Sequence, residues 1–322
     1  MRFEHMASTR GTWSFSATGP NQKASSVSSL GRGYYATSCP NVESIVRSTM
    51  RGLFVRDPTS PAAMIRLLFH DCQVFGCDAS ILLDSGDDGT AEVEASANLG
   101  VRRLDFIDNV KRRLEAACPQ TVSCADIIAI AARDAVALNG GPDIAIPLGR
   151  LDGFRASSSV AQSSLPSASI SVSGMLSLFG SMGMNLPESV AILGAHTLGV
   201  AHCTNFVDRL YPTRDPNMGL LFANSLKARC PRRFPSNAFA ALDTSNLRFD
   251  NSYFRNVLNR RGLLTIDSEL GLDPRTGPIV QNYAANPSAF FSNFASAFVK
   301  LSSFNVLSGN QGEVRGDCRS SN

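Results

Sequence analysis

Eight cysteines spread along most of the chain constrain its fold more than any other feature. They lie at positions 39, 72, 77, 118, 124, 203, 230 and 318, with no Cys-x-x-Cys pair among them, and the chain has no His-Glu-x-x-His motif. The even number and the spacing argue against zinc and thioredoxin-like sites and favour disulfides in an oxidising compartment. Because eight cysteines permit about a hundred pairings, the count predicts a disulfide framework without its connectivity.

Helical periodicity dominates the rest of the pattern. Turn signals such as Gly140-Gly141-Pro142 separate the periodic segments, and no strand-rich block appears. Apolar residues recur three and four positions apart in segments 42–50, 106–114, 127–136 and 172–179. We therefore predict a mainly α fold built from amphipathic helices.

Composition excludes several classes of function. With 43% hydrophobic and 18% charged residues among 322, the chain can bury a large core. Its formal net charge of +3 is too small to indicate a nucleic-acid partner, although it suits weak attraction to an acidic polymer. No apolar run approaches the roughly 18 residues of a membrane span, so no membrane segment is predicted.

One segment combines a cation, a base and hard oxygen donors. If the stretch from Ala62 is helical, Arg66 and His70 stand four residues apart and project from the same face. Asp71, Asp78 and Ser80 follow in a loop that Cys72 and Cys77 could close, and their oxygens are of the kind that calcium takes. The alternative is a solvated acidic turn closed by a disulfide.

The stretch 66–84, Arg-Leu-Leu-Phe-His-Asp-Cys-Gln-Val-Phe-Gly-Cys-Asp-Ala-Ser-Ile-Leu-Leu-Asp, resembles the distal segment of the secreted plant haem peroxidases (class III). The resemblance extends from Gly33 to Cys318. It implies an all-helical haem peroxidase fold whose distal half (about 31–155) and proximal half (about 174–322) sandwich one haem b within a single domain, 31–322. It also implies four disulfides: Cys39 with Cys118, Cys72 with Cys77, Cys124 with Cys318, and Cys203 with Cys230.

The resemblance assigns roles on both sides of the haem. A lone histidine such as His196, in Leu-Gly-Ala-His-Thr-Leu-Gly, is usually a core residue, but it matches the proximal haem ligand. Asp267 matches the carboxylate that accepts the ligand's other N–H, although an Asp at a helix start is more often a cap. On the distal side the implied roles are a base, a fixed cation, a residue that orients the base and a residue that limits access to iron: His70, Arg66, Asn98 and Phe69.

Two calcium sites are implied as well. The proximal run from Asp243 to Asp250 is one residue shorter than the commonest form in the family, so we expect a looser site there. The expected distal ligands are Asp71, Val74, Gly76, Asp78, Ser80 and Glu92. The expected proximal ligands are Thr197, Asp243, Ser245 and Asp250.

The Ser-rich stretch 156–173 reads by composition as a linker or an exposed loop. In the family this segment crosses the exposed haem edge, and Pro166 matches a proline that contacts aromatic substrates. Two other departures from the family pattern are visible. Gln73 and Phe75 replace a common Phe and Asn, and Arg103-Leu104 replaces a Gly-aromatic pair, so haem-edge shape and substrate preference are expected to shift.

Residues 1–30 form a poor secretory signal, because Glu4, His5, Arg10 and Pro20 interrupt any apolar run. The cysteines nevertheless predict an extracellular, cell-wall or vacuolar protein, and we expect residues 1–30 to be an atypical or replaced leader. The single Trp, Trp13, lies in this leader. The surface electron transfer through Trp that some fungal peroxidases use is therefore not expected, and small phenolic donors are favoured over bulky polymers.

The function implied is a monomeric haem peroxidase that reduces hydrogen peroxide to water and oxidises phenolic donors in two one-electron steps. Peroxide removal, phenolic wall metabolism and the response to oxidative stress are the implied roles, with acidic wall polysaccharide as an expected partner. The alternative is a catalytically silent, calcium-dependent wall-binding protein, which loss of Arg66, His70 or His196 would have favoured. A haem oxygen carrier would need an apolar distal pocket, and Arg66 argues against one.

Overall fold

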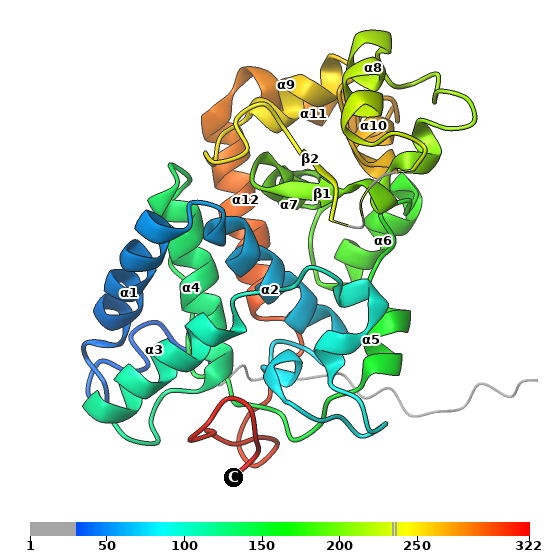
Figure 1. The fold of residues 1–322 in the computed structure, drawn as a ribbon. Helices are drawn as coiled ribbons and strands as arrows, with labels where there is room; N and C mark the ends of the chain where they lie inside the picture. The colour runs from blue at the N-terminus through cyan, green and yellow to red at the C-terminus, as the bar shows by residue number, and fades with distance from the viewer. Residues whose placement is uncertain (1–29, 234, 236) are drawn as a thin grey trace, which may run out of the picture.

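The computed structural model describes residues 30–233, 235 and 237–322. Figure 1 shows a group of early helices beside a second group formed by later residues. The α-helices are α1 (Val42–Arg56), α2 (Ser60–Val74), α3 (Leu104–Ala117), α4 (Cys124–Leu138), α5 (Ser158–Ser164), α6 (Val172–Ser181), α7 (Leu186–Ile192), α8 (Leu220–Arg229), α9 (Ser252–Leu258), α10 (Thr265–Leu270), α11 (Gly277–Ala285) and α12 (Pro287–Ser302). Short 3₁₀ helices are η1 (Ser80–Leu82), η2 (Glu92–Glu94), η3 (Ser96–Asn98), η4 (Leu193–Thr197), η5 (Cys203–Asn205) and η6 (Val207–Arg209). Strands β1 (Val200–His202) and β2 (Phe239–Ala241) pair antiparallel, with Ala201 opposite Ala240.

Helix α4 forms the centre of the first group. Every residue from Cys124 to Val136 is buried, because α1, α2 and α3 all pack against this helix. Ser123 caps its start by accepting a hydrogen bond from the backbone N–H of Asp126 at 3.1 Å. The packing fixes α2, which carries Arg66 and His70, against a rigid neighbour.

An aromatic core holds the second group together. The ring of Phe254 lies 5.1 Å from that of Tyr283 and 4.9 Å from that of Phe290, and Phe249 packs on Phe290 and Phe294. Helix α12, orange in Figure 1, carries two of these rings and packs against α7. It continues to the first group, where it contacts α2. The two groups therefore share one helix.

All four expected disulfides are present. They join Cys39 to Cys118, Cys72 to Cys77, Cys124 to Cys318, and Cys203 to Cys230. The prediction of a mainly α fold with four disulfides is confirmed.

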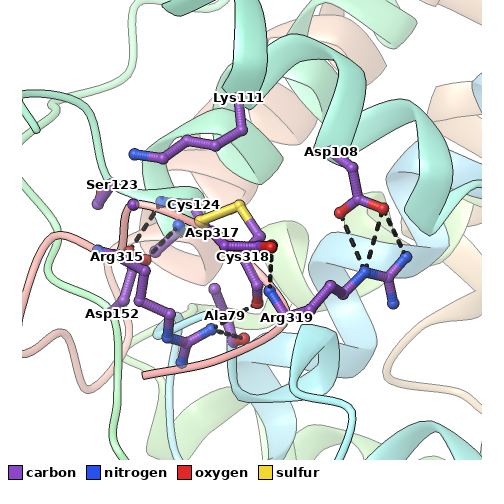
Figure 2. Close-up of a disulfide and its surroundings, with 12 residues drawn as sticks. Ala79, Asp108, Lys111, Ser123, Cys124, Asp152, Arg315, Asp317, Cys318 and Arg319 are labelled. Carbon is purple, nitrogen blue, oxygen red and sulfur yellow. Dashed lines mark hydrogen bonds and ion pairs between the residues drawn. A yellow bond between two sulfur atoms is a disulfide. The ribbon is translucent and has the colours of Figure 1, made fainter. Parts of the chain in front are cut away.

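The C-terminal segment is anchored deep in the first group, as Figure 2 shows around the Cys124–Cys318 disulfide. The carboxylate of Asp152 accepts hydrogen bonds from the backbone N–H groups of Cys124 and Arg315, both at 3.0 Å. The fully buried guanidinium of Arg315 donates to the carbonyl of Ala79 at 3.0 Å. Because Ala79 lies between Asp78 and Ser80, the end of the chain supports the loop that follows α2.

The interpretation of residues 156–173 as a linker or exposed loop is wrong for Ser158–Ser164. Helix α5 forms inside this stretch, and Ser157 caps it by accepting a hydrogen bond from the N–H of Val160. Ala161 is fully buried because α5 packs against α2, η2 and η3. Serine-rich composition concealed a helix whose apolar face is only one or two residues wide.

The expected leader falls almost entirely outside the described residues, so its boundary at residue 30 stays a prediction. From residue 30 onward, none of the described helices has both the length and the hydrophobicity needed to cross a membrane.

Candidate functional site

On the distal side, α2 places Arg66 and His70 on one face, one helical turn apart. The Nε of Arg66 lies 3.0 Å from Nε2 of His70, and Nδ1 of His70 lies 2.7 Å from the side-chain oxygen of Asn98 in η3. Asn98 is oriented in turn, because its amide nitrogen donates to the carbonyl of Glu92 at 2.7 Å. This arrangement fits the tautomer with a proton on Nδ1 and a lone pair on Nε2.

The electrostatics keep His70 neutral. Burial, together with the nearby charge of Arg66, lowers the pKa of His70 to about 4, although the hydrogen bond to Asn98 acts in the opposite direction. The second arm of the Arg66 guanidinium donates to the carbonyl of Leu99 at 2.9 Å, which fixes its direction. A neutral base and a permanent cation therefore share one pocket.

Phe69 connects the distal helix to the second half of the chain. Its ring packs edge-on against His70, with centroids 6.0 Å apart, and against Phe179 of α6, with centroids 6.3 Å apart. Pro166 is half-buried in the segment between α5 and α6. Its contact with substrate stays a prediction.

On the proximal side, His196 sits in η4 and faces α10. Its Nδ1 lies 2.9 Å from Oδ1 of Asp267, which also accepts a 2.9 Å hydrogen bond from the hydroxyl of Tyr253. The other oxygen of Asp267 accepts from the N–H of Leu264 at 2.9 Å, so Asp267 is both a cap of α10 and the partner of His196. The cap interpretation of Asp267 is confirmed, while its role beside a haem ligand stays a prediction that this hydrogen bond to His196 supports.

The contacts of Asp267 favour its ionised form despite its complete burial. Burial alone would raise the pKa of the carboxyl, but the charge and hydrogen bond of His196, together with the donors from Leu264 and Tyr253, lower it below its ordinary value. The commitment of Nδ1 to Asp267 leaves Nε2 of His196 as the nitrogen available to a metal. The donor set therefore fits a haem iron. The side chain of His196 is 28% exposed, so a metal can reach it, whereas that of Asp267 is only 1% exposed.

The loop after α2 gathers buried oxygens that lack partners. Asp71, Ser80 and Glu92 are each completely buried, yet one oxygen of Asp71, the hydroxyl of Ser80 and both carboxylate oxygens of Glu92 have no hydrogen-bond partner among the described residues. Burial, reinforced by the charge of Asp78, raises the pKa of Glu92 to about 8. Unpaired buried carboxylates are costly, and a bound cation such as calcium would compensate them.

Glycines shape this loop by allowing close approaches. Gly76 has a φ of +122°, and a Cβ there would lie 2.2 Å from the carbonyl oxygen of Asn305. Gly153 passes so close to Asp78 that a Cβ would lie 2.2 Å from its carboxylate. Val74, the other expected carbonyl ligand, ends α2 directly before the loop.

The second expected calcium loop also converges. The hydroxyl of Thr197 donates to Asp243 at 2.7 Å and lies 3.4 Å from Asp250, while the hydroxyl of Ser245 lies 3.0 Å from Asp250. Burial, with a contribution from Asp250, raises the pKa of Asp243 to about 6. The shortened run thus still brings its four expected ligands together.

Neither loop is a cluster of charged ligands alone. No set of three or more His, Cys, Asp or Glu side chains in the described part of the chain is arranged to hold a metal by itself. Each loop would therefore need hydroxyl and carbonyl oxygens to complete a coordination shell of six to eight oxygens, which calcium accepts.

Comparisons with known proteins identify the family. A family model described as peroxidase matches residues 46–286. The chain belongs to the peroxidase family. It is similar to three Arabidopsis thaliana proteins: Peroxidase 29 (48% identity, covering 90% of this chain and 88% of the relative), Peroxidase 28 (46%, 90% and 92%) and Peroxidase 57 (47%, 89% and 91%). The resemblance to the plant peroxidases is thereby confirmed, and the family typically carries haem and calcium.

Sequence reasoning missed several residues that shape the site in this peroxidase. Tyr253 shares the carboxylate of Asp267, Arg315 supports the distal loop, and Arg209 contacts the segment before α10. Each makes a contact to a residue distant in sequence, and no local sequence pattern marks such a contact. A single sequence carries no signal that would have identified them.

Proposed function

We propose that this peroxidase reduces hydrogen peroxide at a haem b bound through Nε2 of His196 and oxidises small phenolic donors in two one-electron steps. The observation that carries the proposal is the pairing of a neutral base, His70, with a permanent cation, Arg66, in a chain that also holds a carboxylate-oriented histidine. When bound, haem supplies the redox-active iron at which peroxide is cleaved.

The distal residues would move one proton. With its proton on Nδ1 held toward Asn98, His70 presents the Nε2 lone pair that can accept a proton from peroxide and return it to the departing oxygen. That lone pair now accepts a hydrogen bond from Arg66, so peroxide must displace this contact. The released guanidinium can then stabilise the negative charge that develops on the departing oxygen.

The proximal residues would set the basicity of the ligand. Asp267 holds the Nδ1 proton of His196 and is itself held by Tyr253 and Leu264. A carboxylate that pulls on this proton makes the imidazole a stronger electron donor, which favours cleavage of an O–O bond.

The two loops would hold calcium and stiffen the site. The distal loop follows His70 directly, and the proximal loop includes Thr197, the residue after His196. Calcium in each would therefore fix one histidine. We further propose a secreted, wall or vacuolar location, because four disulfides suit an oxidising compartment.

The test is a stopped-flow absorbance experiment on haem- and calcium-loaded protein mixed with peroxide and then guaiacol. We expect a fast loss of Soret intensity that guaiacol restores in two kinetic steps. His70→Ala should bind haem normally but slow the first step by at least 10²-fold, in the range of general base catalysis. His196→Ala should lose haem, and haem binding without any fast peroxide step in the wild type would favour the silent wall-binding alternative.

A further inference from the structure

A buried arginine outside the haem site contacts the segment that precedes Asp267. The side chain of Arg209, at the end of η6, is 3% exposed. Its Nη1 lies 2.7, 2.6 and 2.8 Å from the carbonyl oxygens of Gly262, Leu263 and Leu264. Three consecutive carbonyls therefore converge on one nitrogen.

The other side of the same guanidinium reaches α10 and a counter-charge. Its Nη2 donates to the hydroxyl of Ser268, and its Nε donates to Asp215 at 2.9 Å. Asp215 neutralises the charge that burial would otherwise make costly. Arg209 thus binds α10 on both sides of Asp267 in the sequence. It contacts residues 262–264 before Asp267 and Ser268 directly after it.

Residues 262–264, which Arg209 contacts, determine the position of the Asp267 carboxylate. Leu264 is the N-cap residue of α10, and its N–H fixes one oxygen of Asp267 at 2.9 Å while the other oxygen faces His196. The backbone is tightly packed here, because a Cβ on Gly262 would lie 2.8 Å from the carbonyl carbon of Asp267. A shift of residues 262–264 would therefore carry Asp267 with it.

We infer that Arg209 is a positioning residue, which holds the start of α10 so that Asp267 keeps its hydrogen bond to Nδ1 of His196. The inference rests on the proposed role of His196 and Asp267. An arginine suits this task because its planar fork donates in several fixed directions and stays charged when buried. A lysine in its place has one nitrogen and cannot serve the three carbonyls, Ser268 and Asp215 together.

The experiment compares Arg209→Lys, Asp267→Asn and the double variant in the haem-loaded protein. The readouts are the Fe(III)/Fe(II) midpoint potential and the iron–histidine stretching frequency from resonance Raman spectra. Both report electron donation by the ligand. Arg150→Lys is the matched control. Arg150 is also fully buried, and it pairs with the carboxylate of Asp126 at 2.7 Å. This pair does not contact His196 or Asp267.

Arg209→Lys should raise the potential and lower the stretching frequency by at least half of the change that Asp267→Asn causes. In the Asp267→Asn background the Arg209 substitution should add nothing further, and Arg150→Lys should leave both readouts at wild-type values. If Asp267→Asn itself changes neither readout, the proposed role of Asp267 fails. A clear Asp267→Asn effect without an Arg209→Lys effect, or with an equal Arg150→Lys effect, would overturn the inference alone.

A milder variant covers the case in which Arg209→Lys does not fold. Asp215→Asn keeps the arginine but removes its counter-charge, and the Asp215 side chain is partly exposed. We expect a smaller change of the same sign in both readouts. A folded Asp215→Asn protein whose readouts match the wild type would count against Arg209 as a positioning residue.

Discussion

Arg103 shows how one residue adapts a family position to this chain. It stands where the family commonly has glycine, and it adopts the left-handed conformation, with a φ of 71°. A non-glycine residue pays a steric cost there. The side chain offsets part of it, because Arg103 and Arg102 both bind the carboxylate of Asp57, which lies between α1 and α2. Strain at the backbone is thus coupled to an ion-pair network.

This network predicts a pH dependence of stability. Burial would raise the pKa of Asp57, but hydrogen bonds from Thr59, Arg103 and Arg102 outweigh it and hold the pKa well below its ordinary value. The unfolded chain then binds more protons below about pH 4, so stability is present above that pH and is lost as the pH falls. Asp57→Asn should lower the free energy of unfolding by about 0.5–1 kcal/mol at pH 5. The acid limb of its stability profile, which is the fall in the free energy of unfolding at low pH measured by urea titration, should be shallower than that of the wild type. An unchanged acid limb would contradict this assignment.

A second prediction concerns the partner of the distal base. Asn98→Leu removes the oxygen that holds the Nδ1 proton of His70 and should slow the peroxide step by about 10–100-fold, as losses of orienting partners commonly do. Stopped-flow rates against peroxide concentration measure this. Haem binding should be unaffected, because the proposed iron ligand is His196 and not His70, and a wild-type rate would show that Asn98 does not orient the base.

At the scale of elements, the distal loop is braced from outside. The segment from Phe75 to Ala79 connects α2 to η1, and its contacts come from much later residues. Asn305 donates to the carbonyl of Phe75, and Arg315 donates to that of Ala79. The ring of Phe75, one of the departures from the family pattern, packs under the guanidinium of Arg155 at 5.6 Å. The loop is therefore positioned by tertiary contacts more than by its own sequence.

Gly76 tests this close packing. Gly76→Ala should lower the free energy of unfolding by more than about 2 kcal/mol, because it adds both a positive-φ penalty and a clash with the carbonyl of Asn305. Gly89→Ala is the matched control, since Gly89 has a φ of +80° but open space around its Cβ position. Chemical denaturation of both variants isolates the clash, and equal losses would show that the approach to Asn305 carries no cost.

The calcium ions expected in the two loops can be counted separately. The wild type should bind two calcium ions, whereas Asp71→Asn and Asp243→Asn should each bind one, because each removes a carboxylate from a different loop. Titration calorimetry on chelator-stripped protein gives the stoichiometry. Stripping should also lower Tm by several degrees, since buried oxygens of Asp71 and Glu92 lose their compensating charge. Two ions bound by either variant would reject that ligand set.

At the scale of the molecule, sequence reasoning succeeded where local pattern is strong. It predicted the helices, the disulfide pairs that the resemblance implied, and a site whose residues do converge, because Arg66 and His70 are adjacent on one helix. It failed for residues 156–173, where serine-rich composition concealed α5. It also gave no sign of Arg209 or Arg315, because a buried arginine that binds backbone carbonyls follows no sequence motif.

The disulfide that closes the longest loop of chain should contribute most to global stability. Cys124 and Cys318 are 194 residues apart, against 27 for Cys203 and Cys230. In the chain-entropy model these bonds contribute about 5 and 3.5 kcal/mol, respectively. Paired Cys→Ala variants, compared by thermal unfolding under oxidising conditions, should rank in that order. An equal or reversed ranking would mean that enthalpy, and not loop closure, dominates.

The support that Arg315 and Cys318 give to the distal loop also imposes an order on how the protein is made. Residues 66–80 are synthesised long before Arg315 and Cys318, so His70 and the loop beside it cannot receive these contacts until residue 318 has been made. Folding of the distal loop into this braced arrangement therefore has to follow synthesis of residues 315–318.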